Sequence, residues 1–526
     1  MVWKIEQPYK PESKKVVWEV APYLRGRGLD IGAGSFKVLP QVISVDNGTD
    51  NVLFGIPFNP DVRVNTAEDL SIFGNSAFDF VYSSHLLEHL VDPFKALKEW
   101  WRVLKLGGVL VLYLPHEDLY PKIGEPGANA DHKHNLNETM IIEWMMRVGG
   151  WDLERNEQRN EDDEYSFLMI FRKLEGKKRA NSYQKPKPAK SCCVVRYGAF
   201  GDMIQTSTVI AGLKKQGYHV TVFASPPGSD VIAHDPNIDK MVLFDKDQVP
   251  NSDLGNFWDW QKRHFDKWVN LSESVEGSLL ALPGRAAHGW TPLARHTLMN
   301  RNYVEIMHQI ADVPHEPKIK FYALPEEKSW AKKQRDSIKY KTLVMWSLAG
   351  SSVHKTWAGL DNIMASILVN YPDAAIMLVG GPECEILEGG WENEPRVFRT
   401  CGKFGIRATF SMLEQVDLLI GPETGVMNAA CCMDMPKVVF LSHSTHENLT
   451  RDWKSVYPLW SKNTHCPGRG DNVVPACHCM HYGFDHCKRD EASGVAQCMA
   501  DLKIADVWEV VDGLLQEITA QRRKQA

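Results

Sequence analysis

Three times along the chain, a short apolar run ends in a glycine-containing turn, and runs of this kind alternate with stretches of helical spacing. The runs occupy residues 27–32, 191–197 and 342–350. Strands that alternate with helices favour parallel, doubly wound sheets, because two parallel strands need a crossover connection that is usually a helix. With 526 residues, the chain is long enough for three such α/β domains of roughly 150 residues each. We predict them at residues 1–174, 191–325 and 326–526.

A basic segment separates the first predicted domain from the second. Residues 177–190 hold six Lys or Arg, two Pro and no acidic residue. Such a composition has little apolar surface to bury against its ordering entropy, so we predict a solvated linker over residues 175–190. The alternative is a basic arm that contacts a phosphate-rich partner.

Composition restricts the class of protein. Hydrophobic residues make up 44%, charged residues 24%, and the formal net charge is −6. These values exclude a disordered or collagenous chain and make nucleic acid an unfavoured partner. Eleven cysteines, an odd number, fit a reducing compartment. No signal-peptide core or apolar run of membrane-spanning length is visible, so we expect a cytoplasmic protein without a membrane span. The oligomeric state stays open.

The first domain carries a glycine-rich turn after one strand and an acidic residue at the end of the next strand. Asp30, Gly32 and Gly34 stand where the strand at 27–32 ends, and Asp46 ends the next strand. Glycines let a backbone approach a ligand closely, and a carboxylate suits a ribose diol. The spacing lacks the third glycine of the nicotinamide-binding turn, which favours another nucleoside cofactor. An ordinary tight turn beside a surface aspartate is the alternative.

Residues 25–172 resemble the class I S-adenosylmethionine-dependent methyltransferases, through LDIGAG, VISVD and the long segment from Asn65 to Pro115. The resemblance implies a Rossmann-like domain that binds S-adenosylmethionine. It places Asp30, Gly32 and Gly34 at the methionine end and Asp46 at the ribose. It further implies that Glu68 and Asp69, with Leu70, flank the adenine, and that Ser83, Ser84 and His85 line the cofactor cleft.

Three histidines are candidate bases for the methyl acceptor: His116, His132 and His134. A base is needed only if the acceptor must lose a proton. A polar surface role is the favoured alternative for each of them. The sequence does not identify the acceptor.

Polar turns also follow the strands of the second and third domains. Asp202 opens a helix after a Gly-x-x-Gly turn, where it serves either as a base for an attacking hydroxyl or as a helix cap. Small and cationic residues that could bind a diphosphate, and acids that could hold a ribose, follow later strands. The residues suited to a diphosphate are Gly350, Ser351, Ser352 and Lys355, and the acids suited to a ribose are Glu383 and Glu385. Glu423, Thr424 and Gly425 place further polar groups and backbone amides at the end of a third strand.

Residues 190–510 resemble the heptosyltransferase-like glycosyltransferases of family nine, through VVRYGAFGD, GSSVHKTW, LVGGPE and VDLLIGPETGVMNAA. The resemblance implies a GT-B pair of Rossmann-like domains, an inverting reaction and a nucleotide-diphosphate sugar donor, with ADP-heptose as the family default. It makes Asp202 the catalytic base and Lys355 the cation at the leaving diphosphate. This chain has Glu423 and Asn428 where the family usually has Asp and a nearby His, which leaves the donor open.

A cysteine- and histidine-rich segment spans residues 466–498. Thiolates at short spacing bind zinc, so we expect a structural zinc held by Cys466, Cys477, Cys479 and Cys487. Unligated buried thiols and a redox disulfide are the alternatives, because the usual CxxC pair is absent.

Together these features predict a bifunctional transferase, in which a methyltransferase is fused to an inverting glycosyltransferase acting on a glycan or glycolipid. One alternative is a monofunctional glycosyltransferase with a catalytically idle N-terminal domain. The other is a nucleic-acid-modifying enzyme, which only the basic segment supports.

Overall fold

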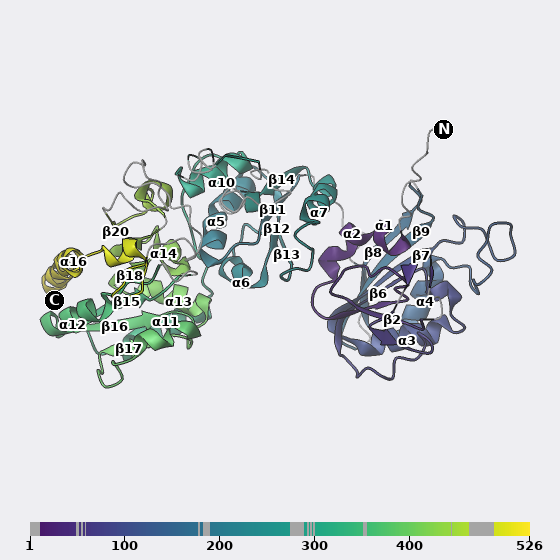
Figure 1. Ribbon diagram of the computed structural model, residues 1–526, viewed down its shortest axis with the longest axis horizontal. Helices are drawn as coiled ribbons and strands as arrows, with labels where there is room; N and C mark the ends of the chain where they lie inside the picture. The colour runs from purple at the N-terminus through teal and green to yellow at the C-terminus, as the bar shows by residue number, and fades with distance from the viewer. Residues whose placement is uncertain are drawn as a thin grey trace. The chain divides into compact units, whose positions relative to one another are not determined.

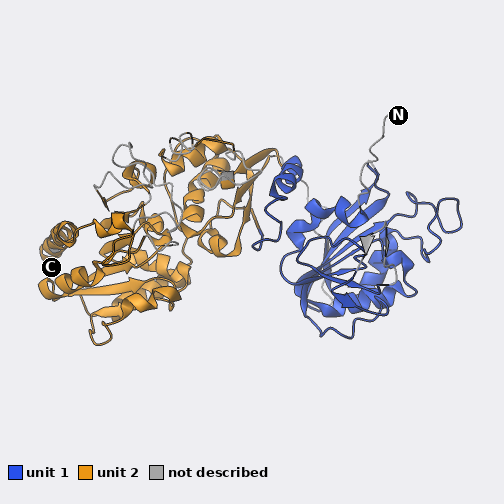
Figure 2. Ribbon diagram, in the orientation of Figure 1, with its two compact units in different colours: residues 1–189, 243–264 blue, residues 190–242, 265–526 orange. Residues whose placement is uncertain are grey.

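A computed structural model shows two compact units, coloured separately in Figure 2. The first comprises residues 1–189 and 243–264, and the second comprises residues 190–242 and 265–526. The structure describes residues 11–48, 52–53, 56–57, 59–161, 163–176, 179–181, 190–273, 289–291, 294, 297, 300–350, 355–442, 444–461 and 489–525.

An eight-stranded sheet forms the centre of the first unit, in the order β10-β8-β9-β7-β6-β1-β2-β5 (Figure 1). The strands from β7 to β5 run parallel, and β9 is antiparallel to both β7 and β8. Their bounds are Gly28–Ile31 (β1), Ile43–Asp46 (β2), Val62–Arg63 (β5), Phe78–Ser84 (β6), Leu104–Pro115 (β7), Trp151–Arg159 (β8), Ser166–Lys173 (β9) and Arg179–Asn181 (β10). A separate hairpin joins β3 (Val52–Leu53) to β4 (Ile56–Pro57).

Two apolar cores cover the two faces of this sheet. Along β7, Leu110 and Leu112 belong to one core, and Val109 and Val111 to the other. Successive side chains of a strand point to opposite faces, so a strand buried on both faces is apolar throughout. The helices α3 (Pro93–Val103) and α4 (Glu138–Val148) contribute to the first core, and α1 (Glu12–Lys15) and α2 (Val17–Val20) lie at the second.

A segment from the middle of the chain completes the first unit. Residues 243–264 include α7 (Leu254–Gln261), whose Phe257 ring meets Trp18 of α2 edge to face at 6.4 Å. Gln261 Nε2 donates to the Trp18 carbonyl at 2.7 Å, and Gln248 Nε2 donates to the Ala21 carbonyl at 2.6 Å. Apolar and polar contacts together therefore attach this segment to the helices at the start of the chain.

The second unit holds two sheets. One has the order β13-β12-β11-β14, with β11 Ser191–Arg196, β12 His219–Ala224, β13 Lys240–Leu243 and β14 Lys267–Asn270, and β11 pairs parallel with both β12 and β14. The other has the order β17-β16-β15-β18-β19-β20, with β15 Thr342–Ser347, β16 Ala374–Val379, β17 Val397–Arg399, β18 Leu418–Pro422, β19 Lys437–Leu441 and β20 Val456–Trp460. Its strands pair parallel throughout.

Helices connect the strands of the second unit (Figure 1). Their bounds are Phe200–Lys215 (α5), Pro226–Ser229 (α6), Tyr303–Ala311 (α10), Pro325–Ser337 (α11), Leu360–Asn370 (α12), Ile406–Met412 (α13), Gly425–Ala430 (α14), Gln497–Ala500 (α15) and Ile504–Gln525 (α16). The amphipathic stripe of α16 buries Val507, Val511 and Leu515 in the core of the six-stranded sheet. The last helix therefore packs against this sheet.

The predicted fold class of α/β domains with parallel sheets is confirmed. The basic segment differs in part from the solvated linker that we predicted, because residues 179–181 form β10 and pair with β8 at the edge of the eight-stranded sheet. A strand edge offers backbone hydrogen bonds to any neighbouring segment, whatever the side chains. Among the described helices, none has the length and apolar character needed to span a membrane.

Candidate active sites

In the first unit, the turn after β1 and the end of β2 are joined by hydrogen bonds. Gly32 N donates to the Val45 carbonyl at 2.8 Å, and Gly34 N lies 3.3 Å from Asp46 Oδ2. Gly32 has a φ of +75°, and a Cβ there would lie 2.7 Å from the Leu86 side chain. Only glycine fits this position without strain. The predicted turn therefore brings the end of β1 and the end of β2 together.

Asp30 and Asp46 differ in their environments. Asp30 is buried and accepts a hydrogen bond from Val38 N at 2.7 Å. Burial raises the pKa of Asp30 to about 7, against the lowering effect of that hydrogen bond. Asp46 is half-buried, and its Oδ1 accepts from Gly48 N at 2.9 Å. Asp30 thus holds the loop, and Asp46 keeps lone pairs for a ligand.

The other predicted cofactor residues are engaged in the protein itself. Glu68 Oε1 accepts from the backbone amides of Val91 and Asp92, at 2.8 and 3.0 Å. Asp69 is exposed and accepts from Ser71 N in a turn. Ser83 is fully buried, and its hydroxyl donates to the Ile31 carbonyl. These contacts position the loops around the end of β6.

Two of the candidate bases already have partners. His116 is buried, with Nε2 at 3.0 Å from Glu138 Oε2 and Nδ1 accepting from Asp118 N. It is therefore not the surface histidine that the favoured alternative described. His134 Nε2 lies 3.0 Å from the Leu90 carbonyl. Each ring is therefore held in place by contacts within the first unit.

The third candidate, His132, belongs to a cluster that the sequence analysis did not identify. It lies with His89 around Glu88, whose side chain is fully buried. Burial raises the pKa of Glu88 to about 8 and lowers that of His132 to about 4. His85, with a φ of +47°, is adjacent, and burial lowers its pKa to about 3. The Leu-Leu-Glu-His run at 86–89 was the available signal, because it puts an acid and a histidine directly after a strand.

In the second unit, Asp202 occupies the first turn of α5. Its Oδ2 accepts from Ala199 N at 3.1 Å, and its Oδ1 lies 3.1 Å from Arg196 Nη2. Arg196 is buried and also donates to the Leu271 carbonyl at 2.6 Å. The helix-cap role is therefore realised. The side chain remains 35% exposed, so the oriented carboxylate is also accessible to a substrate.

Two helix starts meet at the junction of the two sheets. A Cβ on Gly425 of α14 would lie 2.7 Å from Phe200 Cβ, and one on Gly201 would lie 3.0 Å from Asn428 Nδ2. Gln205 Nε2 of α5 donates to Asn428 Oδ1 at 2.6 Å. Asn428 takes the position where the resembled family has histidine, and here it joins α14 to α5.

Lys355 reaches the same junction from the other side. It is buried, and Nζ donates to the Glu423 carbonyl at 3.1 Å. Gly350 lets its side chain pass, since a Cβ there would lie 2.6 Å from Lys355 Cδ. Thr424 caps α14 by accepting from Met427 N, and its hydroxyl lies 3.0 Å from Ser347 Oγ. Ser351 and Ser352, which we predicted in this site, lie outside the described residues.

Glu423 itself has a structural role. It is buried, and its Oε1 accepts from Ser442 Oγ at 2.7 Å and from Ser442 N at 3.0 Å. The carboxylate therefore ties the end of β18 to the end of β19, and its backbone carbonyl faces Lys355.

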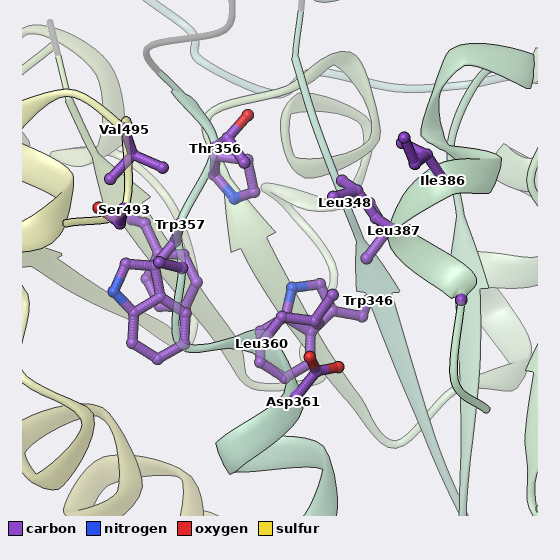
Figure 3. A pocket seen from close by; sticks show the side chains of 14 residues that line it. Trp346, Leu348, Thr356, Trp357, Leu360, Asp361, Ile386, Leu387, Ser493 and Val495 are labelled. Atoms are coloured by element: carbon purple, nitrogen blue, oxygen red, sulfur yellow. The ribbon is translucent and has the colours of Figure 1, made fainter. Parts of the chain in front are cut away.

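A pocket of about 310 Å³ lies at Thr356, the residue after Lys355. Trp346, Trp357 and Phe440 line it, and Asp361 and Thr356 add polar groups. Figure 3 shows Trp357 beside Ser493 and Val495, with Ile386 and Leu387 across the cavity. The sequence analysis treated the two tryptophans only as parts of a strand and a turn. The pocket size and lining suit an aromatic ligand.

Glu383 and Glu385 lie on the turn that carries Ile386 to this pocket, and both are exposed. Glu388, one turn further, is buried and accepts from Cys401 N at 2.9 Å. The four cysteines expected to bind zinc, Cys466, Cys477, Cys479 and Cys487, lie outside the described residues.

Comparison with known proteins supports the assignment of the first unit. Residues 29–112 match the family model of a methyltransferase domain. This match confirms the predicted methyltransferase domain and, with it, the transferase class. No curated protein sequence matches the chain.

Several solved structures resemble parts of the chain. A glycosyl transferase of family 9 from Veillonella parvula is 17% identical, with a TM-score of 0.46, over 63% of this chain and 99% of its own. The ADP-heptose lipopolysaccharide heptosyltransferase II of E. coli is 12% identical, with a TM-score of 0.44, over 62% and 99%. The YcgJ protein from Bacillus subtilis is 17% identical, with a TM-score of 0.24, over 31% and 99%.

Proposed function

We propose that the chain is a bifunctional transferase. Its first unit transfers a methyl group from S-adenosylmethionine, and its second transfers a sugar, with inversion, from a nucleotide-diphosphate donor. The observation that supports the second activity most is the convergence of Lys355, the start of α14 and the start of α5 at one junction.

The residues of the first unit fit S-adenosylmethionine. Asp46 is half-buried beside the Gly32–Gly34 turn, and it retains acceptor capacity for a ribose diol. Gly32 and Gly34 both have a positive φ, which favours glycine, and their lack of a side chain lets a ligand approach the backbone closely. When bound, the cofactor supplies an electrophilic methyl group. The protein orients this group towards an acceptor, which is the main contribution that in-line methyl transfer needs.

A titration tests this part of the proposal. Isothermal calorimetry of the full chain with S-adenosylmethionine should show binding, and Asp46→Asn should weaken it by about tenfold, the equivalent of ~1.4 kcal/mol. Asp118→Asn, which changes an exposed carboxylate of the same unit, should leave binding unchanged. Absence of binding to the wild-type protein would reduce the first unit to a scaffold and favour a monofunctional glycosyltransferase.

In the second unit, we place the donor diphosphate at the Lys355 junction. The ammonium is held by a backbone carbonyl, which still leaves two of its three protons for phosphate oxygens. Backbone amides at the start of α14 and the hydroxyl of Thr424 add neutral donors. Groups fixed in place before the reaction stabilise a leaving diphosphate without reorganisation.

We place the nucleoside base in the pocket lined by Trp346 and Trp357. Large aromatic side chains offer planar surfaces for a base, and the adjacent Thr356 follows Lys355 directly in the chain. Glu383 and Glu385 stand on the turn beside the pocket, where their carboxylates can accept hydrogen bonds from a ribose. ADP-heptose is the donor proposed by default.

Asp202 is the proposed base. Arg196 and the Ala199 amide hold its two oxygens at 3.1 Å each, so the carboxylate is oriented before an acceptor binds. It would take the proton of the acceptor hydroxyl as that oxygen forms a bond to the anomeric carbon and the bond to the diphosphate breaks. A single displacement of this kind inverts the anomeric centre. We propose a glycan or glycolipid as acceptor.

Tryptophan fluorescence tests the donor site. ADP, GDP, UDP and CDP should be titrated separately, because Trp346 and Trp357 would report a bound base. The preferred nucleotide should bind about tenfold more weakly to Lys355→Ala than to Lys341→Ala, which removes an exposed surface lysine. If no nucleotide changes the fluorescence or binds by calorimetry, the glycosyltransferase proposal fails.

A further inference from the structure

A buried carboxylate of the first unit is surrounded by imidazole rings. The Glu88 side chain is fully buried, and among the described residues neither of its oxygens has a hydrogen-bond partner. Its Oε1 lies 3.9 Å from Nε2 of His89 and 3.9 Å from Nε2 of His132. An unpaired buried carboxylate is costly, and a bound cation would remove that cost.

We propose that Glu88, His89 and His132 bind one divalent transition-metal ion, of the Zn²⁺ or Fe²⁺ type. Their ligand atoms all lie within 4.8 Å of one another. Two imidazole nitrogens and one carboxylate oxygen suit these metals, whereas Mg²⁺ and Ca²⁺ prefer oxygen ligands alone. Three protein ligands leave further coordination positions open for a small molecule.

The protein frame already holds the three ligands close to the required spacing. Ligand atoms of a tetrahedral zinc site lie about 3.4 Å apart. The two histidine nitrogens therefore need to approach Glu88 Oε1 by about 0.5 Å each, and no pair of the three ligand atoms needs to close by more than about 1.4 Å. The backbone that carries them is fixed, because Lys133 N and His134 N both donate to the Glu88 carbonyl, at 2.8 and 3.2 Å. The loop of His132 is thereby attached to the turn that carries Glu88 and His89.

Neighbouring groups orient the ligands. The Tyr120 ring lies against the His132 ring, with the ring centroids 5.1 Å apart. The His89 ring meets the His132 ring edge to face at 4.7 Å. His85 Nδ1 lies 3.8 Å from Glu88 Oε1, and its Nε2 is held by Ser166 Oγ at 3.0 Å. The His89 side chain is 27% exposed, so a ligand can enter on its side.

The position of the cluster indicates its use. Glu88 follows β6 by four residues, and Leu86 between them lies against Gly32 of the predicted cofactor turn. A metal here would bind an oxygen atom of the methyl acceptor beside the cofactor. This role rests on the proposed methyltransferase function, whereas the metal site itself does not.

Cobalt binding tests the proposal, because Co²⁺ replaces Zn²⁺ and its absorption spectrum reports its ligands. The full-length protein should bind about one Co²⁺ whose spectrum lacks sulfur-to-metal charge transfer. Cobalt in the cysteine-rich segment 466–498 would show that charge transfer, so the two sites are distinguishable. Glu88→Gln and His132→Gln should each lose about one equivalent of the sulfur-free cobalt.

His134→Gln is the matched control, since His134 is in the same loop but faces the Leu90 carbonyl. It should retain the metal. The proposal is overturned if the wild-type protein binds no cobalt through nitrogen and oxygen, or if Glu88→Gln and His132→Gln both retain it.

X-ray absorption and a cofactor titration separate the metal site from the folding of the variants and from the proposed methyltransferase. If the variants do not fold, X-ray absorption of the cobalt-loaded wild type decides: imidazole scattering supports the site, and a shell of sulfur alone contradicts it. S-adenosylmethionine is titrated into the same samples without any acceptor. Failure of that titration would contradict the proposed methyltransferase and leave the cobalt result standing.

Discussion

Gln205 Nε2 donates to Asn428 Oδ1 at 2.6 Å, and both side chains are buried. This bond joins α5, which connects β11 to β12 of the four-stranded sheet, to α14, which connects β18 to β19 of the six-stranded sheet. Asn428 also donates through Nδ2 to the Thr424 carbonyl at 2.9 Å, at the start of α14. One amide therefore connects the proposed donor site to the helix that carries Asp202.

A double-mutant cycle should measure this connection. Gln205→Leu and Asn428→Leu each leave a buried polar partner unsatisfied, at a cost of about 1–3 kcal/mol in the free energy of unfolding of the second unit. The double variant should lose less than the sum of the two, by about 1 kcal/mol. Denaturant unfolding of all four proteins gives the coupling energy. Full additivity would mean that the bond contributes nothing.

Gly425→Ala should disturb the same junction sterically. Its Cβ would lie 2.7 Å from Phe200 Cβ and 3.2 Å from Gly201 N, so the two helix starts must move apart. We expect a loss of about 1–3 kcal/mol in stability and weaker nucleotide binding in the fluorescence titration. Gly513→Ala is the control: it lies exposed inside α16 with open space around it, and should stabilise the chain by about 0.5–1 kcal/mol. Unaltered nucleotide affinity in Gly425→Ala would show that the donor does not bind there.

The buried ion pairs of Glu19 should matter for the first unit. Glu19 in α2 is 1% exposed and lies between Arg155 and Arg159 of β8, with Oε2 at 2.8 Å from Arg159 Nη1. Glu19→Ala leaves two partly buried guanidinium groups without this partner and should cost about 3–5 kcal/mol, measured by chemical denaturation. Glu157→Ala removes an exposed partner of Arg155 and should cost less than about 1 kcal/mol. Equal effects of the two substitutions would contradict this account of the pair.

The pKa of Asp30 predicts how stability depends on pH. Burial raises it to about 7 in the folded chain, from 3.8 in the unfolded chain. The folded state therefore binds more protons between these values, and stability falls as the pH rises from about 4 to about 7. Asp30→Asn keeps an acceptor for Val38 N and should flatten this part of the stability profile. Thermal unfolding from pH 4 to 8 measures it, and an unchanged slope in Asp30→Asn would assign the dependence to other groups.

Local sequence patterns predicted much of the fold. The strands at 28–31 and 43–46 lie where the sequence analysis placed them, and the helix at 93–103 follows a start signal that is visible in the sequence, Asp92 before Pro93. Asp92 caps that helix by accepting from Lys95 N, and Leu104 then begins β7 directly. Periodicity and capping are short-range properties, so they can be recognised in one sequence.

What could not be predicted depends on distant contacts. Nothing in the spacing of residues 243–264 shows that Phe257 packs on Trp18, because only the folded chain brings these rings together. Likewise, Glu383 and Glu388 are both acids after one strand, yet the first is exposed and the second is buried against Cys401 N. Burial decides which acid binds a ligand and which holds a loop, and burial is a tertiary property.

The most direct test of two independent sites in one chain is native mass spectrometry of the full-length protein. The wild type should bind S-adenosylmethionine and a nucleoside diphosphate at the same time. We predict that Asp46→Ala loses the first ligand and keeps the second, and that Lys355→Ala does the reverse. A wild-type chain that binds neither ligand, or a single substitution that removes both, would contradict the account.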